Sequence, residues 1–438
     1  MAKRKGVELY AGPGGWSEGA KMARPDLTLY GFEFDEAACE TARAAEHFRR
    51  CVDILNVDPH EIWDLLGSID YLHASPPCQG FSMAGKGAGR RDGERLLTAL
   101  RLMAEAKSTI RVKAIIETFA KDAEDPRSMH VLVAMLWIAV IRPCYVSFEQ
   151  VPTVLPLWEE AARTLRAWGY DARAKVLNAE QYGVPQTRRR AILIASLDDD
   201  VAFPAPTHSR YYPRTPDKLD EGVQKWVSMA EALGWGMPRR PCPTVSTGTA
   251  AGGTDPQALG GSQARAIVHG AREQGDWVDQ PADHPKATHQ RRNSGPGAAR
   301  DPRSIDAPSY TVRAHGSGSH PSGLEWVDRE KVAEEVGPRV NNQSGTEFDH
   351  AWPADRPAPV IAGRGLAPMP GANANRFNGS TKSRNDGVRI TVQEAGILQS
   401  FPTDYPWTGT STKQFEQVGN AVPVLLARAI VDSLLPLE

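Results

Sequence analysis

Cysteine is scarce in this chain of 438 residues, and the cysteines that occur are not paired. There are five of them, and no two are spaced as a C-x-x-C pair. An odd, widely spaced set excludes a disulfide framework and a cysteine-based zinc cluster, so we expect no metal site. It also indicates a reducing compartment, and the chain is therefore expected to be cytoplasmic.

The chain also lacks an excess of charge of either sign and a long hydrophobic run. Its formal net charge is −2, so a nucleic-acid-binding surface would have to be made by gathering positive side chains locally. No run approaches the roughly 18 apolar residues of a membrane span, so no membrane partner is expected. With 41% hydrophobic residues over 438 positions, the chain is long enough for at least two domains.

Residues 1–198 alternate short apolar runs with helical patterns. Strands are predicted at 7–10, 27–34, 69–74, 145–148 and 191–195, and helices at 36–47, 95–106 and 128–140. Such alternation predicts an α/β fold with a Rossmann-like, doubly wound, mostly parallel sheet and helices on both faces.

Composition changes after residue 198, and residues 199–387 are dominated by Gly, Pro, Ser, Thr and Arg. One interpretation is a disordered linker. Scattered tryptophans favour an ordered, loop-rich inserted domain instead, because disordered segments are poor in aromatic residues. Helical patterns return at 392–398 and 424–435, which predicts that residues 388–438 rejoin the first domain.

A glycine-rich turn at residues 10–19 connects the first predicted strand to the first helix. Glycines allow close approach of a ligand, and the helix N-terminus offers N–H donors. Glu33 follows the second strand, where a carboxylate can bind ribose hydroxyls, and Asp53 follows a third candidate strand. The turn lacks a strict G-x-G-x-x-G, which argues against NAD, and solvated loop charges are the alternative for both acids.

Cys78 lies in the segment 75–82, directly after the strand predicted at 69–74. A thiol in a Pro-Pro turn at the end of a strand is placed for nucleophilic attack. The alternative is a structural cysteine, since free cysteines are usually buried and inert.

Glu149 ends the strand predicted at 145–148 and precedes a turn bounded by proline. Ligands bind outside the carboxyl ends of parallel strands, so this side chain is a candidate site residue, with an ordinary surface charge as the alternative. Glu117 follows a similar apolar pair but runs into a polar stretch of helical or loop character, which makes it the weaker candidate.

Three consecutive arginines, Arg188, Arg189 and Arg190, precede the strand predicted at 191–195. Alternate side chains of an extended segment point to opposite sides, so Arg188 and Arg190 should share one side. A pair of guanidinium groups on one side suits a phosphate or a polarised carbonyl oxygen.

Taken in order, these segments resemble the motifs of the cytosine-C5 DNA methyltransferases. The matching segments are 10–19, 33–35, 53–54, 76–79, 149–151, 186–190, 389–402 and 417–423. An ordered set near both ends of the chain is far more specific than any single motif. The resemblance implies a class I methyltransferase fold with a catalytic and cofactor-binding domain at 1–198, a target-recognition domain at 199–387, and a C-terminal segment at 388–438 that rejoins the catalytic domain.

The resemblance also implies the roles of individual residues. Cys78 would add to C6 of a cytosine flipped out of the duplex, and Glu149 would bind N3 and the exocyclic amine. Arg190 would stabilise the polarised carbonyl or brace the cysteine turn, and Arg188 would help to hold the base. S-adenosylmethionine would donate the methyl group and leave as S-adenosylhomocysteine. The residues implied for the cofactor are Tyr10, Ala11, Gly12, Gly14, Gly15, Trp16, Glu33, Phe34, Asp53, Ile54, Pro77, Asn420 and Val422. Those expected to contact DNA are Gln79, Ser82, Arg239, Arg240, Arg313 and Arg376.

The expected partner is double-stranded DNA, met by a monomer that serves as a prokaryotic or phage modification enzyme, with a cognate restriction endonuclease as a further candidate partner. Two alternatives stay open: an RNA cytosine-C5 methyltransferase and a catalytically silent DNA-binding relative. Two features depart from the family pattern. Gln150 stands where the family has Asn, and the stretch from Arg95 to Arg142 is longer than the family needs.

Overall fold

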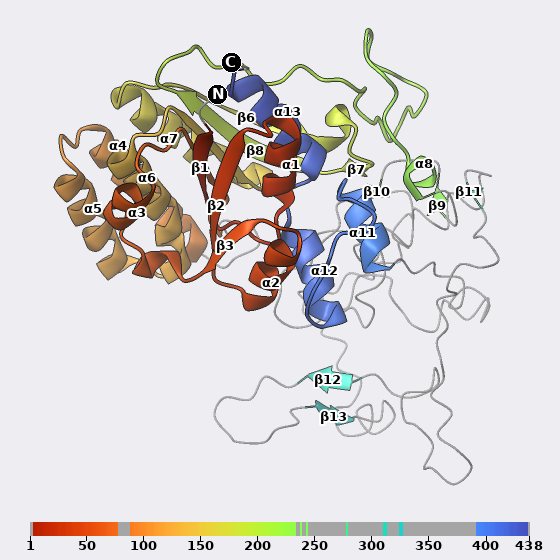
Figure 1. The fold of residues 1–438 in the computed structure, drawn as a ribbon, viewed down its shortest axis with the longest axis horizontal. Helices are drawn as coiled ribbons and strands as arrows, with labels where there is room; N and C mark the ends of the chain where they lie inside the picture. Colours follow the sequence, from red (N-terminus) through yellow and green to blue (C-terminus); the bar gives the residue numbers. More distant parts are fainter. Residues whose placement is uncertain are drawn as a thin grey trace, which may run out of the picture. The chain divides into compact units, whose positions relative to one another are not determined.

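The computed structural model describes residues 3–77, 88–233 and 391–436, together with short strands at 237–238, 242–243, 277–278, 310–312 and 324–326. Its centre is a seven-stranded sheet in the order β3-β2-β1-β4-β5-β8-β6 (Figure 1). The strands are β1 (Arg4–Leu9), β2 (Leu27–Glu33), β3 (Phe48–Cys51), β4 (Tyr71–Ala74), β5 (Tyr145–Gln150), β6 (Asp171–Asn178) and β8 (Arg189–Ser196). Of these seven, β8 alone runs against its neighbours, which confirms the predicted mostly parallel sheet.

Side chains alternate between two apolar layers along the strands. Leu72 and Val146 belong to one layer, and Tyr71 and Tyr145 belong to the other. The layer of the tyrosines is covered by two helices that lie side by side, α1 (Gly15–Ala23) and α13 (Val424–Leu434) (Figure 1). The opposite layer is covered by α3 (Pro59–Leu66), α4 (Ala88–Ala104), α5 (Thr109–Asp122), α6 (His130–Ile141) and α7 (Leu155–Ala167). Helices therefore cover both faces, as predicted.

The strand order reverses between β1 and β4. The chain builds outward from β1 through β2 to β3, and then returns to place β4 on the other side of β1. Leu9 and Ala74, the last residues of β1 and β4, lie opposite each other in the register. Ligands of open α/β sheets bind at such a reversal, outside the carboxyl ends of the strands. The glycine-rich turn and the turn that leads to Cys78 begin at this point.

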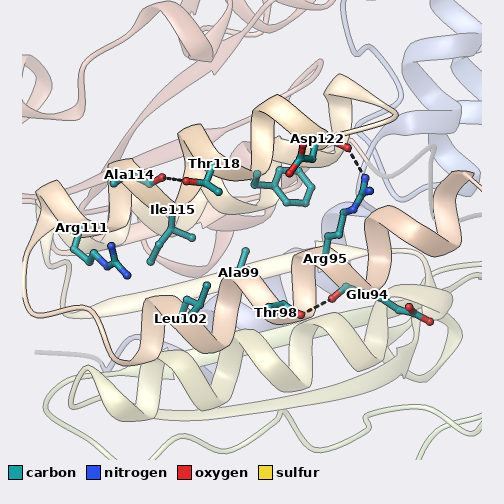
Figure 2. A pocket seen from close by; sticks show the side chains of 11 residues that line it. Glu94, Arg95, Thr98, Ala99, Leu102, Arg111, Ala114, Ile115, Thr118 and Asp122 are labelled. Carbon is teal, nitrogen blue, oxygen red and sulfur yellow. Dashed lines mark hydrogen bonds between the residues drawn. The ribbon is translucent and has the colours of Figure 1, made fainter.

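The long stretch from Arg95 to Arg142 consists of most of α4 together with α5 and α6. Glu117 lies on α5 as an exposed helical residue, so it does not end a strand. Between α4 and α5 runs a groove of about 540 Å³ (Figure 2). Arg95 donates a hydrogen bond across it to the backbone carbonyl of Asp122.

The C-terminal segment packs against α1 and the glycine-rich turn. It contains α11 (Val392–Leu398), α12 (Ser411–Asn420) and α13, as predicted for the first and last of these. Arg24, which caps the C-terminal end of α1, pairs with Asp432 on α13 at 2.7 Å, and its Nε donates to the carbonyl of Leu435 at 2.9 Å. Tyr405 donates to the carbonyl of Pro13 in the glycine-rich turn at 2.5 Å. None of the helices in the described ranges is long and apolar enough to cross a membrane.

The remaining elements are small. They include α2 (Glu36–Ala44), α8 (Met229–Leu233), the strand β7 (Gln186–Thr187), which pairs with β10 (Cys242–Pro243), and β9 (Met237–Pro238), which pairs with β11 (Trp277–Val278). A second compact unit, residues 285–352 and 367–379, contains the antiparallel pair β12 (Tyr310–Val312) and β13 (Leu324–Trp326).

Candidate active site

The glycines of the turn after β1 serve two different purposes. Gly12 has a φ of 53°, and a side chain there would have nothing within 4 Å, so this part of the turn faces open space. A Cβ on Gly15 would lie 2.2 Å from the carbonyl of Val422, and one on Gly14 would lie 2.5 Å from the Tyr405 hydroxyl. Gly12 therefore leaves room for a ligand, whereas Gly14 and Gly15 allow the C-terminal segment to pack against the turn.

Glu33, the last residue of β2, connects the turn that follows β2 to the glycine-rich turn that follows β1. Its Oε2 accepts a hydrogen bond from the N–H of Gly12 at 2.9 Å. Its Oε1 accepts from the N–H groups of Phe34 and Asp35 at 2.8 and 2.9 Å. Phe34 beside it is 76% exposed, which leaves a large aromatic side chain uncovered next to a carboxylate.

Asp53 lies near the same place, at the start of a 3-10 helix, η1 (Ile54–Asn56). Its side chain accepts from the N–H of Leu55 at 3.0 Å, and Ile54 is buried. Burial raises the pKa of Tyr10 well above its usual value, and the charges of Asp53 and Glu33 raise it further. The Tyr10 hydroxyl itself donates to the backbone carbonyl of His130 at 3.1 Å.

Not every predicted cofactor residue borders this space. Trp16 is 1% exposed and its ring stacks on that of His73, with centroids 3.5 Å apart. Ala11 and Val422 are also buried, whereas Asn420 at the end of α12 is exposed and Pro77 is half-buried.

Glu149 at the end of β5 forms an ion pair with Arg190. The Arg190 Nε lies 2.7 Å from Glu149 Oε1, and the two side chains are only 11% and 7% exposed. The pairing follows from β8 running antiparallel beside β5, since Gln150 lies opposite Ala191 in the register. Burial lowers the pKa of Arg190, and the Glu149 carboxylate opposes that effect. A charged pair in a site of low polarity holds its geometry, because separating the two groups would leave an unpaired buried charge.

Arg188 shares a side with Arg190, as the alternation predicts, while Arg189 is exposed. Burial lowers the pKa of Arg188 well below its usual value, and the neighbouring Arg190 charge lowers it further. Its guanidinium donates to the carbonyls of Gly419 and Ala421, at 3.0 and 3.1 Å. Arg190 is therefore the arginine that contacts Glu149, and Arg188 contacts the C-terminal segment.

The turn toward Cys78 is described as far as Pro77. Gln150 donates from its Nε2 to the carbonyl of Pro76 at 2.9 Å, which ties the turn to the end of β5. Sequence reasoning treated Gln150 only as a departure from Asn and missed this contact. The predicted site residues that lie outside the described ranges are Cys78, Gln79, Ser82, Arg239, Arg240, Arg313 and Arg376.

Glu180, in the 3-10 helix η5 (Ala179–Tyr182), is a buried carboxyl that sequence reasoning also missed. It is 3% exposed, and burial raises its pKa to about 7. Because the folded state binds this proton more tightly than the unfolded state, the stability it contributes is complete below about pH 4.5 and is lost as the pH rises through 7. The sequence carried only a weak signal for it, because Glu180 comes two residues after β6 (Asp171–Asn178), a strand that the sequence did not predict.

We expect Glu180→Gln to stabilise the protein at pH 8 by on the order of 2 kcal/mol and to leave its stability at pH 4.5 little changed. The amide carries no charge, so the cost of ionising a buried group disappears. Urea unfolding of both proteins between pH 4.5 and 8 checks this. An equal fall in stability with pH in the variant and the parent would contradict the assignment.

Comparison with protein families identifies one match over most of the chain. The family model of the C-5 cytosine-specific DNA methylases matches residues 4–111, 118–233 and 299–435. The unmatched residues between these ranges are 112–117, which fall within α5, and 234–298.

Several curated proteins are similar over nearly the full chain. The type II methyltransferase M1.HphI of Haemophilus parahaemolyticus is 24% identical over 442 residues, covering 99% of this chain and 87% of the relative. M.DdeI of Desulfomicrobium norvegicum is 22% identical, covering 98% and 88%. M.AgeI of Thalassovita gelatinovora is 24% identical, covering 98% and 99%.

Solved structures with similarity to this chain include two methyltransferases. One is a putative DNA modification methyltransferase encoded within a prophage of E. coli, with 16% identity, a TM-score of 0.46 and coverage of 98% of both chains. The other is the methyltransferase EhMeth of Entamoeba histolytica, with 12% identity, a TM-score of 0.48 and coverage of 99% of this chain and 98% of that one.

Proposed function

The chain belongs to the family of C-5 cytosine-specific DNA methylases, and from that premise we propose that it methylates C5 of a cytosine flipped out of duplex DNA, through an adduct between Cys78 and C6. Cytosine C5 is too weak a nucleophile to take a methyl group unaided. Addition of the Cys78 thiolate to C6 places electron density on C5, which then attacks the methyl donor. Loss of the C5 proton to a base and departure of the thiolate restore the aromatic ring and the enzyme.

The observation that carries this proposal is the buried pair of Glu149 and Arg190 beside the turn that leads to Cys78. The pair occupies Glu149 Oε1, so the second carboxylate oxygen is the one available to a base. In the proposed reaction the Glu149 carboxyl group brings a proton to N3 as charge develops on the ring, and accepts a hydrogen bond from the exocyclic amine. Gln150 follows Glu149 directly and donates a hydrogen bond to Pro76, two residues before Cys78. This hydrogen bond links the segment of the acid, Glu149, to the segment of the nucleophile, Cys78.

The residues at the carboxyl ends of β1, β2 and β3 fit S-adenosylmethionine. When bound, this cofactor supplies an electrophilic methyl group on its sulfonium. Glu33 and Asp53 carry carboxylate oxygens that can accept hydrogen bonds from ribose hydroxyls and the adenine amine, and the exposed ring of Phe34 offers a stacking surface. The open space at Gly12 supports the same assignment, because the backbone there can be approached closely.

We expect Glu33→Gln to weaken binding of S-adenosylhomocysteine about 10- to 100-fold, because a hydrogen bond to a charged acceptor is replaced by one to a neutral amide. Isothermal titration calorimetry measures this directly. Glu36→Gln is the matched control, since Glu36 is an exposed carboxylate only three residues away. Equal affinities of the Glu33 variant and the parent would remove Glu33 from the cofactor site.

We further propose that residues 199–387 select the target sequence, and that residues 1–198 and 388–438 together form the catalytic domain. The contacts of α13 with α1 and of Arg188 with Gly419 and Ala421 support the second part. The type II methyltransferases among the relatives support a role as a prokaryotic or phage modification enzyme, for which a cognate endonuclease would be the partner.

The test is transfer of a labelled methyl group from S-adenosylmethionine to duplex DNA, with tRNA as the competing substrate. The proposal expects label in DNA, recovered as 5-methylcytosine, and none in tRNA. Label in tRNA alone would favour an RNA methyltransferase. No transfer to either substrate, with cofactor binding intact, would favour a catalytically silent DNA-binding protein.

A further inference from the structure

A chain of hydrogen bonds crosses the buried centre of the protein from α1 to the turn before Cys78. Trp16 Nε1 lies 2.9 Å from the Tyr71 hydroxyl, and that hydroxyl lies 2.6 Å from Ser147 Oγ. His73 Nδ1 lies 2.8 Å from the same Ser147 Oγ, and His73 Nε2 lies 3.0 Å from Ser75 Oγ. Four of these residues are 1% exposed or less, and Ser75, the last, is half-buried.

Each contact in this chain joins polar side-chain atoms. The indole N–H of Trp16 can only donate, so the Tyr71 oxygen accepts from it. His73 uses both ring nitrogens, Nδ1 toward Ser147 and Nε2 toward Ser75. Burial lowers the pKa of His73 well below its usual value, which keeps the ring neutral, so one of its nitrogens donates and the other accepts.

Gln150 adds a second, separate attachment at the next residue. Its Nε2 donates to the carbonyl of Pro76, while its Oε1 accepts from the N–H of Val151 at 2.6 Å. Both ends of the amide are thus engaged, which fixes its rotamer. His73 therefore bonds to Ser75, and Gln150 bonds to Pro76. Ser75 and Pro76 are consecutive residues, and they begin the turn that contains Cys78.

We infer that His73 and Gln150 are positioning residues, which hold the turn of Cys78 at the place where its thiol meets the base. The part of this inference that concerns the reaction rests on the proposed function. Neither residue touches the reacting atoms, and each acts through one hydrogen bond to the turn. A misplacement of the nucleophile by a fraction of an ångström lowers the rate of the chemical step, while binding of cofactor and DNA is retained.

The test compares His73→Asn, Ser75→Ala and the double variant. Asparagine keeps a partner for Ser147 but is too short to reach Ser75, and Ser75→Ala removes only the last hydrogen bond. Hydrogen exchange of the Ser75, Cys78 and Gln79 amides measures how firmly the turn is held, and it does not require activity. Steady-state methyl transfer separates effects on kcat from effects on KM. Tyr170→Phe is the matched control, because it removes a buried hydrogen bond to Pro143 at the opposite edge of the sheet.

Each single variant is expected to lower kcat about tenfold, with both KM values within about twofold of the parent, and to speed exchange of the turn amides by a similar factor. The double variant should be no worse than the worse single one, since both break the same contact. The effects of Gln150→Ala and Ser75→Ala on kcat should multiply when the two are combined, since they break separate contacts.

Wild-type exchange rates in all the variants, or effects of His73→Asn and Ser75→Ala that multiply, would overturn the inference. A loss of kcat in Tyr170→Phe equal to the loss in His73→Asn would also overturn it, because it would show that His73 contributes only to stability. Failure of the proposed function is a distinct result: the parent protein would not methylate DNA, while the exchange measurement would still report whether the turn is held.

Discussion

Replacement of Cys78 by Ser is expected to abolish covalent capture of DNA and to lower methyl transfer by at least about 10⁴-fold. A hydroxyl is far less acidic than a thiol, so it supplies almost no anion to add to C6 at neutral pH. Duplex DNA with 5-fluorocytosine at the target measures capture directly. Fluorine at C5 cannot be removed as a proton is, so the adduct persists and survives denaturing electrophoresis.

The matched control for this prediction is Cys144→Ser. Cys144 is a free cysteine directly before β5, at the edge of the sheet opposite the site. We expect this variant to capture 5-fluorocytosine DNA as the parent does. Capture that survives in the Cys78 variant, or that is lost in the Cys144 variant, would remove Cys78 as the nucleophile.

Replacement of Glu149 by Gln is expected to lower kcat by about 10²- to 10³-fold, the usual scale for loss of a positioned acid or base. Glutamine has nearly the same shape, and its side-chain oxygen can still accept a hydrogen bond from Arg190. It cannot supply a proton as charge develops on the base, so the effect should fall on kcat more than on KM. Single-turnover methyl transfer at saturating DNA and cofactor isolates the chemical step.

Glu160→Gln is the control for Glu149, because Glu160 is also a buried carboxylate with an arginine partner. It is 5% exposed and lies 2.8 Å from Arg163 on α7. We expect its single-turnover rate to match that of the parent. Equal rates for the Glu149 variant and the parent would show that Glu149 contributes packing alone.

The part of the fold that the sequence predicts correctly is the part with strong local patterns. The strands β2, β4 and β5 are apolar runs followed by recognisable turns, which is enough to locate them. The strand β6 is not predicted, because half of its sequence DARAKVLN is polar or charged, its alternating residues are mostly small, and it lies at the edge of the sheet. Its structure depends on pairing with β8, which no local pattern reports.

The helices α5 and α7 were missed for a related reason. The apolar pair Ile115 and Ile116 was compared with the approach to a strand end, whereas both side chains pack into the helical layer. The helix α7 follows a turn rich in proline, and these prolines obscure the helical pattern that begins there.

The site was predictable as a set of motifs, and its contacts were not. That Glu149 meets Arg190, while Arg188 meets the C-terminal segment, depends on the antiparallel insertion of β8 beside β5. His73 was counted within an apolar strand, and its two serine partners are brought to it only by the fold. A polar ring within a fully buried strand was the signal that could have identified it.

Bisulfite sequencing of DNA from a host without cytosine-C5 methyltransferases of its own, expressing this chain, tests the central claim most directly. The account predicts protected cytosines at one position of a short recurring sequence with the parent protein, and none with Cys78→Ser. Full conversion of cytosine with the parent protein, or equal protection with the Cys78 variant, would contradict it.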